Sequence, residues 1–413
     1  MRALLLAALC ASPALAAPPA AAKYLYDGKL VDGEKALKTH LETGPGDDET
    51  KFGLGAIQFL RAFEKLGQGL YKHGLRVQSN FPGMPRGLAR LMPENDKPEK
   101  ADYKAIRAIA EDVLKSLNEA EKTLASIKGG KVKMPLKVAQ IKLDLWGKGD
   151  PIDAVMVFQG AGQNDLATAS KDLVVGFDRG DSVWLRGYCH FLAAVVEVVL
   201  SLDGKEAFDA AAHRFFAKAD TPHKAWLDEE DHRIGDGPFA FLSFPLLADG
   251  VALVVHALNL EIKEPARLKS AHAHLKQMAA MSKEMWKHIL AEEDDDNEWI
   301  PNPKQRGVMQ VAVTKEIIDE WLKTVEAWEE ILEGKKLLPF WRGKPGARGV
   351  NLKKVFTDPP KRLEITRWVQ GAAATPYLEK GDLTPLADPK RLQRIDRTFG
   401  GGLGFFGFAA WFN

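Results

Sequence analysis

The chain has 413 residues, of which 46% are hydrophobic and 27% charged, and its formal net charge is +1. This hydrophobic content is enough to build the core of one large domain or two ordinary ones. The balanced charge argues against a strongly basic surface, so from global charge we expect neither a nucleic-acid partner nor a membrane partner.

The first 17 residues predict a cleavable secretory signal peptide. Arg2 supplies a positive charge, Ala3 to Leu9 form an apolar run, and Ala14-Leu15-Ala16 places small residues before a cleavage site after Ala16 or Ala17. The apolar run is far shorter than the roughly 20 residues of a membrane-spanning helix. We therefore expect an exported protein, periplasmic or extracellular.

Removal of the signal peptide also removes Cys10 and leaves Cys189 as the single cysteine. No intramolecular disulfide is then possible, so the fold must depend on its hydrophobic core. Leu9, directly before Cys10, is too large for a lipoprotein signal, so simple secretion is favoured. We expect no transmembrane segment in the rest of the chain.

Shifts in composition divide the chain into five segments. The signal peptide (1–17) is followed by an N-terminal helical region (18–130), a β-rich insert (131–160), a main helical region (161–334) and an irregular, basic, aromatic-rich C-terminal region (335–413). The predicted fold is mainly α: a multi-helical array or bundle with a minor β-hairpin and an irregular aromatic- and glycine-rich C-terminal segment.

Apolar residues that recur every three or four positions predict amphipathic helices. These helices cover residues 33–42, 48–72, 106–124, 181–202, 204–217, 239–260, 265–291 and 314–333. Asp47 or Asp48 and Thr314 are the expected N-caps, and Pro245 is expected to divide its helix. Alternating apolar residues near 132–145 and a second run, Ala154 to Phe158, predict the hairpin.

Two resemblances emerge from these residues. The helix pair from Gly33 to Gly55 resembles the junction of two tetratricopeptide repeats, although no second copy follows at the expected period. The segments Asp294 to Pro303 and Arg179 to His190 resemble an uncharacterised family of exported bacterial proteins, a resemblance that implies no activity.

The candidate site residues lie in two apolar helices. In the helix 181–202, the polar residues Arg186, His190 and Glu197 fall within about 40° of one another on the helix surface. In the helix 239–260, Asp249 and His256 are two turns apart on one face. Burying an unpaired charge among apolar residues costs free energy, so we expect each of these residues to have an ion-pair or hydrogen-bond partner.

If these two helices pack side by side, two imidazoles and two carboxylates converge, a ligand set suitable for zinc, manganese or iron. The spacing matches no known metal motif, so structural ion pairs remain the favoured alternative and a pocket for an organic ligand the next. An Arg186–Glu197 bridge is one such structural role. Cys189 is expected to be a small buried hydrophobe rather than a nucleophile. No cofactor is strongly implied.

Two segments have features of calcium sites. The segment from Asp144 to Gly149 has the first acid and the turn glycine of an EF-hand loop, but Trp146 and Lys148 replace required ligands, so we expect no calcium there. The acidic run Asp294 to Glu298 has sufficient charge for a cation, although a solvated helix end is the favoured interpretation.

The C-terminal region combines positive charge with aromatic residues. Residues 335–367 contain 10 basic and 2 acidic side chains, which either neutralise the acidic stretch before them or form an anion-binding surface. The tail from Phe399 to Asn413 is expected to be packed against the protein, with membrane contact as the alternative.

The sequence is compatible with two functions. The first is a non-enzymatic binding or scaffold protein of the cell envelope, whose partner is another envelope protein or a small ligand. The second is a hydrolase or metalloenzyme built around Arg186, His190, Glu197, Asp249 and His256 between buried helices.

Overall fold

The computed structural model describes residues 20–43, 47–76, 93–130, 132–156, 172–222, 224–229, 244–344, 346 and 348–413. The predicted signal peptide lies outside these residues.

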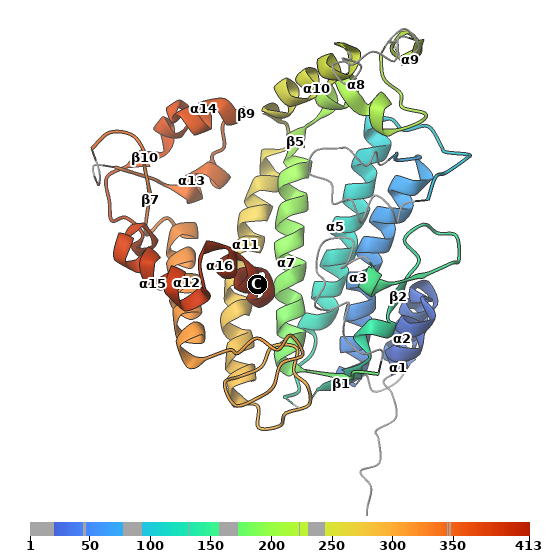
Figure 1. Ribbon diagram of the computed structural model, residues 1–413, viewed down its shortest axis with the longest axis vertical. Coiled ribbons are helices and arrows are strands. Elements are labelled where there is room, and N and C mark those ends of the chain that lie inside the picture. Colours follow the sequence, from blue (N-terminus) through green and yellow to red (C-terminus); the bar gives the residue numbers. More distant parts are fainter. Residues whose placement is uncertain are drawn as a thin grey trace, which may run out of the picture.

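Long helices lie side by side in a single curved row (Figure 1). The members of the row, in spatial order, are α2 (Leu30–Thr43), α3 (Asp48–Lys72), α5 (Tyr103–Ala125), α7 (Arg179–Ser201), α11 (Pro265–Ala291) and α12 (Lys315–Leu332). Each helix contacts the next, and α7 and α11 share the most extensive interface. The prediction of a mainly α, multi-helical array is therefore confirmed.

Shorter helices cover the ends and one flank of the row. α1 (Ala20–Asp27) packs on α2 and α3, while α8 (Lys205–Phe215), α9 (Lys224–Glu229) and α10 (Phe244–Ala257) lie at the upper end in Figure 1. The flank beside α12 contains α13 (Leu352–Thr357), α14 (Ile365–Gln370) and α15 (Pro389–Phe399), while α16 (Gly402–Phe412) packs on α15 and lies in front of α11 in Figure 1. Short 3₁₀ helices span Val138–Gln140, Ala372–Tyr377 and Pro385–Ala387.

The helix limits agree closely with those predicted from apolar periodicity. Asp47 caps α3 by accepting a hydrogen bond from the Thr50 amide, and Thr314 caps α12 by accepting one from the Ile317 amide. Pro245 lies in the first turn of α10, and residues 239–243 lie outside the described residues, so the expected division of the helix at Pro245 stays a prediction. A proline is tolerated at that position because first-turn amides have no intrahelical acceptor.

The strands are short and form small antiparallel sheets. β1 (Lys133–Leu136) pairs with β4 (Val175–Asp178), β2 (Lys142–Leu143) with β3 (Ile152–Asp153), and β6 (Asn259–Ile262) with both β5 (Leu202–Asp203) and β9 (Arg362–Glu364). β8 (Gly349–Val350) pairs with β7 (Leu338–Pro339) and β10 (Leu378–Glu379). The predicted hairpin is thus β2–β3. Its second strand precedes the predicted run, because residues 154–156 are helical.

Helix α7 contributes to the two largest hydrophobic cores. Leu185 and Cys189 belong to the core built from α1, α2, α3, α5 and β1. Val183 belongs to the core formed by α11, α12, α15 and α16, which includes the fully buried Trp286 and Phe412. The two halves of the chain are therefore joined through this helix.

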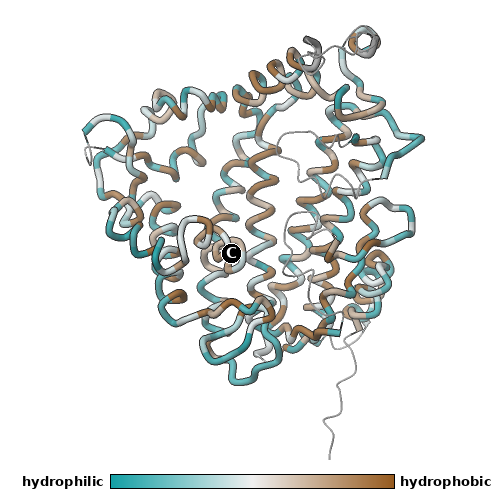
Figure 2. The backbone as a smooth tube through the Cα atoms, in the orientation of Figure 1, coloured by the Kyte–Doolittle hydropathy of each residue, from teal (hydrophilic) through white to brown (hydrophobic). Residues whose placement is uncertain are grey.

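The outward face of α7 is apolar. Phe191, Val195 and Val199 are 41–57% exposed, and Figure 2 shows apolar positions along the helix. By length and composition, α7 is the one helix of the described residues that could cross a membrane. Half of that stretch is buried inside the protein, and the core helix of a soluble protein would pass the same test, so this finding is weak evidence for a membrane span.

The C-terminal region is more ordered than its composition predicts. Where an irregular segment was expected, α15 and α16 each span 11 residues. The turn between them, Gly400-Gly401, has φ angles of 75° and 98°, a conformation accessible mainly to glycine. Gly404 permits a second close approach, since a Cβ there would lie 1.9 Å from the carbonyl oxygen of Phe399.

Candidate functional site

The polar face of α7 points inward, between α5 and α11. His190 and Glu197 are each only 8% exposed, although both lie on a long apolar helix. Because α5 and α11 flank this face, side chains of both helices can reach it. The polar residues that the sequence analysis identified on α7 therefore have partners from α5 and α11, not from α10.

Arg186 and His190 share one partner on α5. Both Nε and Nη2 of Arg186 donate to Oε1 of Glu121, at 3.2 and 3.0 Å. Nε2 of His190 lies 3.5 Å from the same oxygen. Hydrogen bonding to His190, together with the charges of His190 and Arg186, lowers the pKa of Glu121 below its ordinary value despite burial. Glu121 is therefore a carboxylate that neutralises this part of the interface.

His190 also contacts a second histidine, His274 on α11. Their Nδ1 atoms are 2.9 Å apart, so one ring must donate a proton and the other accept it. Burial and the neighbouring His190 lower the pKa of His274, which favours its neutral form. Glu121 and His274 have no distinguishing sequence signal, since each lies on an amphipathic helix where polar residues are ordinary.

Glu197 is paired with Arg267 of α11. Nη1 of Arg267 donates to Glu197 at 3.1 Å, and its Nε donates to Glu264 at 2.7 Å. Glu264 also accepts a hydrogen bond from Arg107 of α5. The buried carboxylate of Glu197 is therefore part of an ion-pair network, and the considered Arg186–Glu197 bridge does not form.

Asp249 and His256 lie elsewhere, where α10 packs on α8. Asp249 accepts hydrogen bonds from Nε2 of His213 at 3.0 Å and from Nε of Arg214 at 2.6 Å. His256 lies 3.3 Å from Glu206 at the surface. The expected convergence of the two histidines and two carboxylates therefore does not occur, because α7 packs on α5 and α11 and α10 packs on α8.

An open groove of about 480 Å³ lies beside α5. It is lined by Glu111, Leu114, Lys115, Asn118, Glu119 and Lys122 of α5 and by Arg267 of α11. Arg267 connects the groove to the buried network, since the same guanidinium holds Glu197. Most of the lining residues are charged, with both signs present, while carbon atoms form the larger part of the groove surface.

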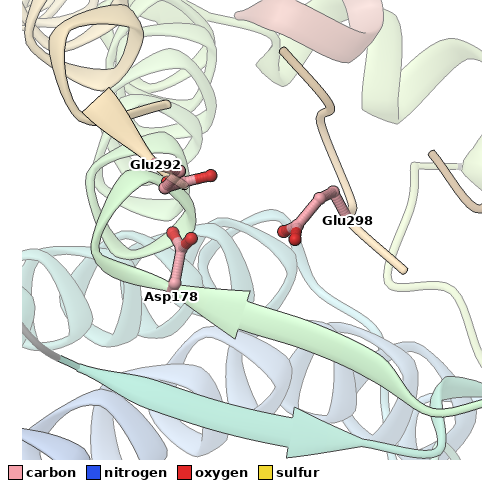
Figure 3. Close-up of side chains that lie close together, drawn as sticks. All are labelled: Asp178, Glu292 and Glu298. Atoms are coloured by element: carbon pink, nitrogen blue, oxygen red, sulfur yellow. The ribbon is translucent and has the colours of Figure 1, made fainter. Parts of the chain in front are cut away.

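A separate cluster of acids lies where α7 begins and α11 ends (Figure 3). Oxygen atoms of Asp178, Glu292 and Glu298 all lie within 4.8 Å of one another. Asp178 is the N-cap of α7, accepting a hydrogen bond from the Gly180 amide at 2.7 Å, and Asp181 completes a capping box. The spacing is compatible with a divalent cation, while the capping bonds give Asp178 a structural role.

Burial and nearby acids raise the pKa values of Glu292 and Glu298. Burial, reinforced by Asp178, raises the pKa of Glu292 to about 10, and burial raises the pKa of Glu298 to about 7. Oε1 of Glu292 is buried without a hydrogen-bond partner. Glu292 therefore holds its proton at neutral pH, which removes one negative charge from the cluster.

Only part of this cluster has a sequence signal. The acidic run Asp294 to Glu298 has charge enough for a cation, but Asp294 and Asp296 bind Lys133 instead. Glu298 points inward, toward Asp178 and Glu292 (Figure 3). An aspartate directly before a helix, followed by another three residues later, is a sequence signal for the capping box, and it could have drawn attention to Asp178 and Asp181.

No protein-family model, curated protein or solved structure matches this chain. The geometry of the chain itself is therefore the basis for a functional proposal.

Proposed function

We propose that the chain is an exported, non-enzymatic binding protein of the cell envelope, and that the groove beside α5 holds an acidic segment of another envelope protein. The observation that carries the proposal is the distribution of paired and unpaired charges. The buried polar residues of α7 are held in ion pairs or hydrogen bonds, whereas Lys115 and Lys122 on the groove wall form no ion pair within the described part of the chain.

The two lysines are on the same helix, seven residues apart, so they are separated by about 10 Å along α5. Asn118 lies between them and can donate and accept hydrogen bonds. Two separated positive charges with an amide between them match an extended acidic segment better than a compact anion. Because the groove is open, binding would be sensitive to salt and of modest affinity.

A photo-crosslinking amino acid placed at Asn118 tests this function in producing cells. We expect an adduct with a specific envelope protein that disappears when Lys115→Glu and Lys122→Glu are added. The matched control carries the crosslinker at Lys35, an exposed position on α2. The same adducts from both positions, or an adduct that survives charge reversal, would refute the proposal.

A metalloenzyme, with hydrolysis as its reaction, is the second candidate function. The facing Nδ1 atoms of His190 and His274, with Glu121 behind Nε2 of His190, favour it, because metal-bound histidines commonly have a carboxylate at the other ring nitrogen. A transition metal such as zinc would take the place of the proton between the rings.

Metal analysis of protein purified without chelators distinguishes this candidate. It requires stoichiometric metal that is lost in His274→Ala and retained in His288→Ala, a control on the same helix whose side chain is 34% exposed. Metal-free, folded wild-type protein would exclude it.

A further inference from the structure

The helices α15 and α16 form a hairpin at the surface that is anchored by aromatic residues. On α16, Phe405, Phe408 and Phe412 face the protein, and the ring of Phe412 contacts Trp286 and Trp321 with centroid distances of 4.9 and 5.6 Å. These three positions follow a helical spacing of three and four residues, so they occupy one face. The hairpin is therefore held in a fixed orientation on the core.

The opposite face of α16 is also apolar, although it faces solvent. Leu403 is 91% exposed and Phe406 is 69% exposed, and Gly407 and Ala410 extend the same face. The aromatic residues inside already anchor the helix, so Leu403 and Phe406 are not needed for packing within the described structure. Two large apolar side chains projecting from a well-anchored helix are a feature of surfaces that enter an apolar environment.

The neighbouring helix α15 supplies positive charge. Lys390, Arg394 and Arg397 are exposed, and none forms an ion pair within the residues that the structure describes. Arg391, by contrast, turns inward to Glu320 at 2.7 Å. The helix contains four basic residues and one acidic residue, Asp396. Three free cations thus lie on the helix directly before the exposed leucine and phenylalanine.

We propose that the α15–α16 hairpin docks the protein on an anionic phospholipid bilayer. Leu403 and Phe406 insert at the boundary between headgroups and acyl chains, while Lys390, Arg394 and Arg397 contact lipid phosphates. Apolar insertion alone or charge attraction alone does not give stable attachment. Stable peripheral binding to a membrane generally requires both. α16 has 11 residues, too few to span a bilayer, so the hairpin lies in the interface.

Charge complementarity favours an anionic bilayer over a second copy of the chain as the partner of this surface. Two copies meeting through this hairpin would bring their basic helices together, which like-charge repulsion opposes. A bilayer of phosphatidylglycerol presents the opposite charge and an apolar interior in the same surface. The proposal is independent of the groove beside α5, which lies on other helices.

Vesicle sedimentation tests the proposal with the chain from residue 18 onward. We expect binding to vesicles that mix phosphatidylglycerol with phosphatidylcholine, and little binding to phosphatidylcholine alone. The triple change Lys390→Gln, Arg394→Gln and Arg397→Gln should lower partitioning roughly a hundredfold, since each basic residue near an anionic surface contributes about fivefold. The pair Leu403→Ser and Phe406→Ser should lower it at least about tenfold.

Matched variants separate docking from general charge and hydrophobicity. The control for charge replaces the exposed Lys35, Lys104 and Lys269 with Gln, and the control for apolar exposure replaces Val31 and Val369 with Ser. Both controls should bind as wild type does. Equal binding to neutral and anionic vesicles, equal loss in test and control variants, or a dimer formed through this face that excludes vesicles would overturn the proposal.

Discussion

Arg186 of α7 places both Nε and Nη2 against a single oxygen of Glu121 on α5, 3.2 and 3.0 Å away. The Arg186 side chain is 15% exposed and that of Glu121 is 22% exposed, so neither charge is well solvated. His190 of α7 lies beside the same carboxylate and also contacts His274 of α11. The Glu121 carboxylate therefore links α5 to α7 directly and to α11 through His190.

The first prediction follows from this pair. Glu121→Ala leaves Arg186 partly buried without its partner, so we expect the free energy of unfolding to fall by about 3 kcal/mol. Chemical denaturation followed by tryptophan fluorescence measures the change. The control, Glu119→Ala, removes a more exposed carboxylate on the same helix and should cost less than about 1 kcal/mol. Equal losses in both variants would contradict a special role for Glu121.

The second prediction concerns pH and Glu292. Its pKa is raised from 4.5 to about 10 in the folded protein. Below about pH 4.5 the Glu292 carboxyl is protonated in both the folded and the unfolded protein, so it does not change the free energy of unfolding with pH. Between the two values the folded protein holds a proton that the unfolded chain releases, so stability falls as pH rises, by at most about 1.4 kcal/mol per pH unit.

Glu292→Gln should therefore flatten the decline in melting temperature between about pH 5 and pH 9, and should stabilise the protein at the alkaline end. Glu293→Gln, a change at an exposed neighbour, is the control and should leave the profile as it is in wild type. A profile for Glu292→Gln that matches wild type would show that the cluster does not titrate in this way.

The third prediction concerns the thiol of Cys189. The side chain is 1% exposed, and burial raises its pKa above the ordinary value. Since the thiolate is the reactive form, a thiol reagent at about pH 8 should label Cys189 only after denaturation. Absorbance of the released chromophore reports the reaction. Rapid labelling of the native protein would indicate that the interface of α5 with α7 opens readily.

The fourth prediction concerns the two glycines of α16. In Gly404→Ala the new Cβ would lie 1.9 Å from the carbonyl oxygen of Phe399, so the hairpin must shift and stability should fall by about 2 kcal/mol or more. Nothing lies within 4 Å of a Cβ at Gly407, so Gly407→Ala should be neutral or stabilising by up to about 1 kcal/mol. Differential scanning calorimetry measures both, and the reverse order would contradict the packing described for α16.

The helices of the row could be predicted because each has an apolar stripe with a helical period and a recognisable cap, as at Asp47 and Thr314. Helix α16 escaped prediction because it is apolar on both faces, so periodicity does not distinguish it from an irregular segment. Its glycines also argue against a helix, yet Gly404 is present because the chain passes so close to Phe399.

The candidate site could be predicted only as a set of separate residues. Helical geometry correctly grouped Arg186, His190 and Glu197 on one face, but their partners depend on which helices meet that face, which is a tertiary property. The acidic cluster was harder still, because Asp178 and Glu292 are far apart in sequence and meet only when α7 and α11 pack together.

The division of α7 between two cores has a consequence for how the protein folds during synthesis. The first core uses residues from Ala21 to Cys189, so it can form once α7 is available. The second core, which begins at Val183, cannot close until Phe412 has been made. Until then α7 lacks α11, and Glu197 lacks Arg267. A chain delayed at that stage would be a natural substrate for chaperones and proteases.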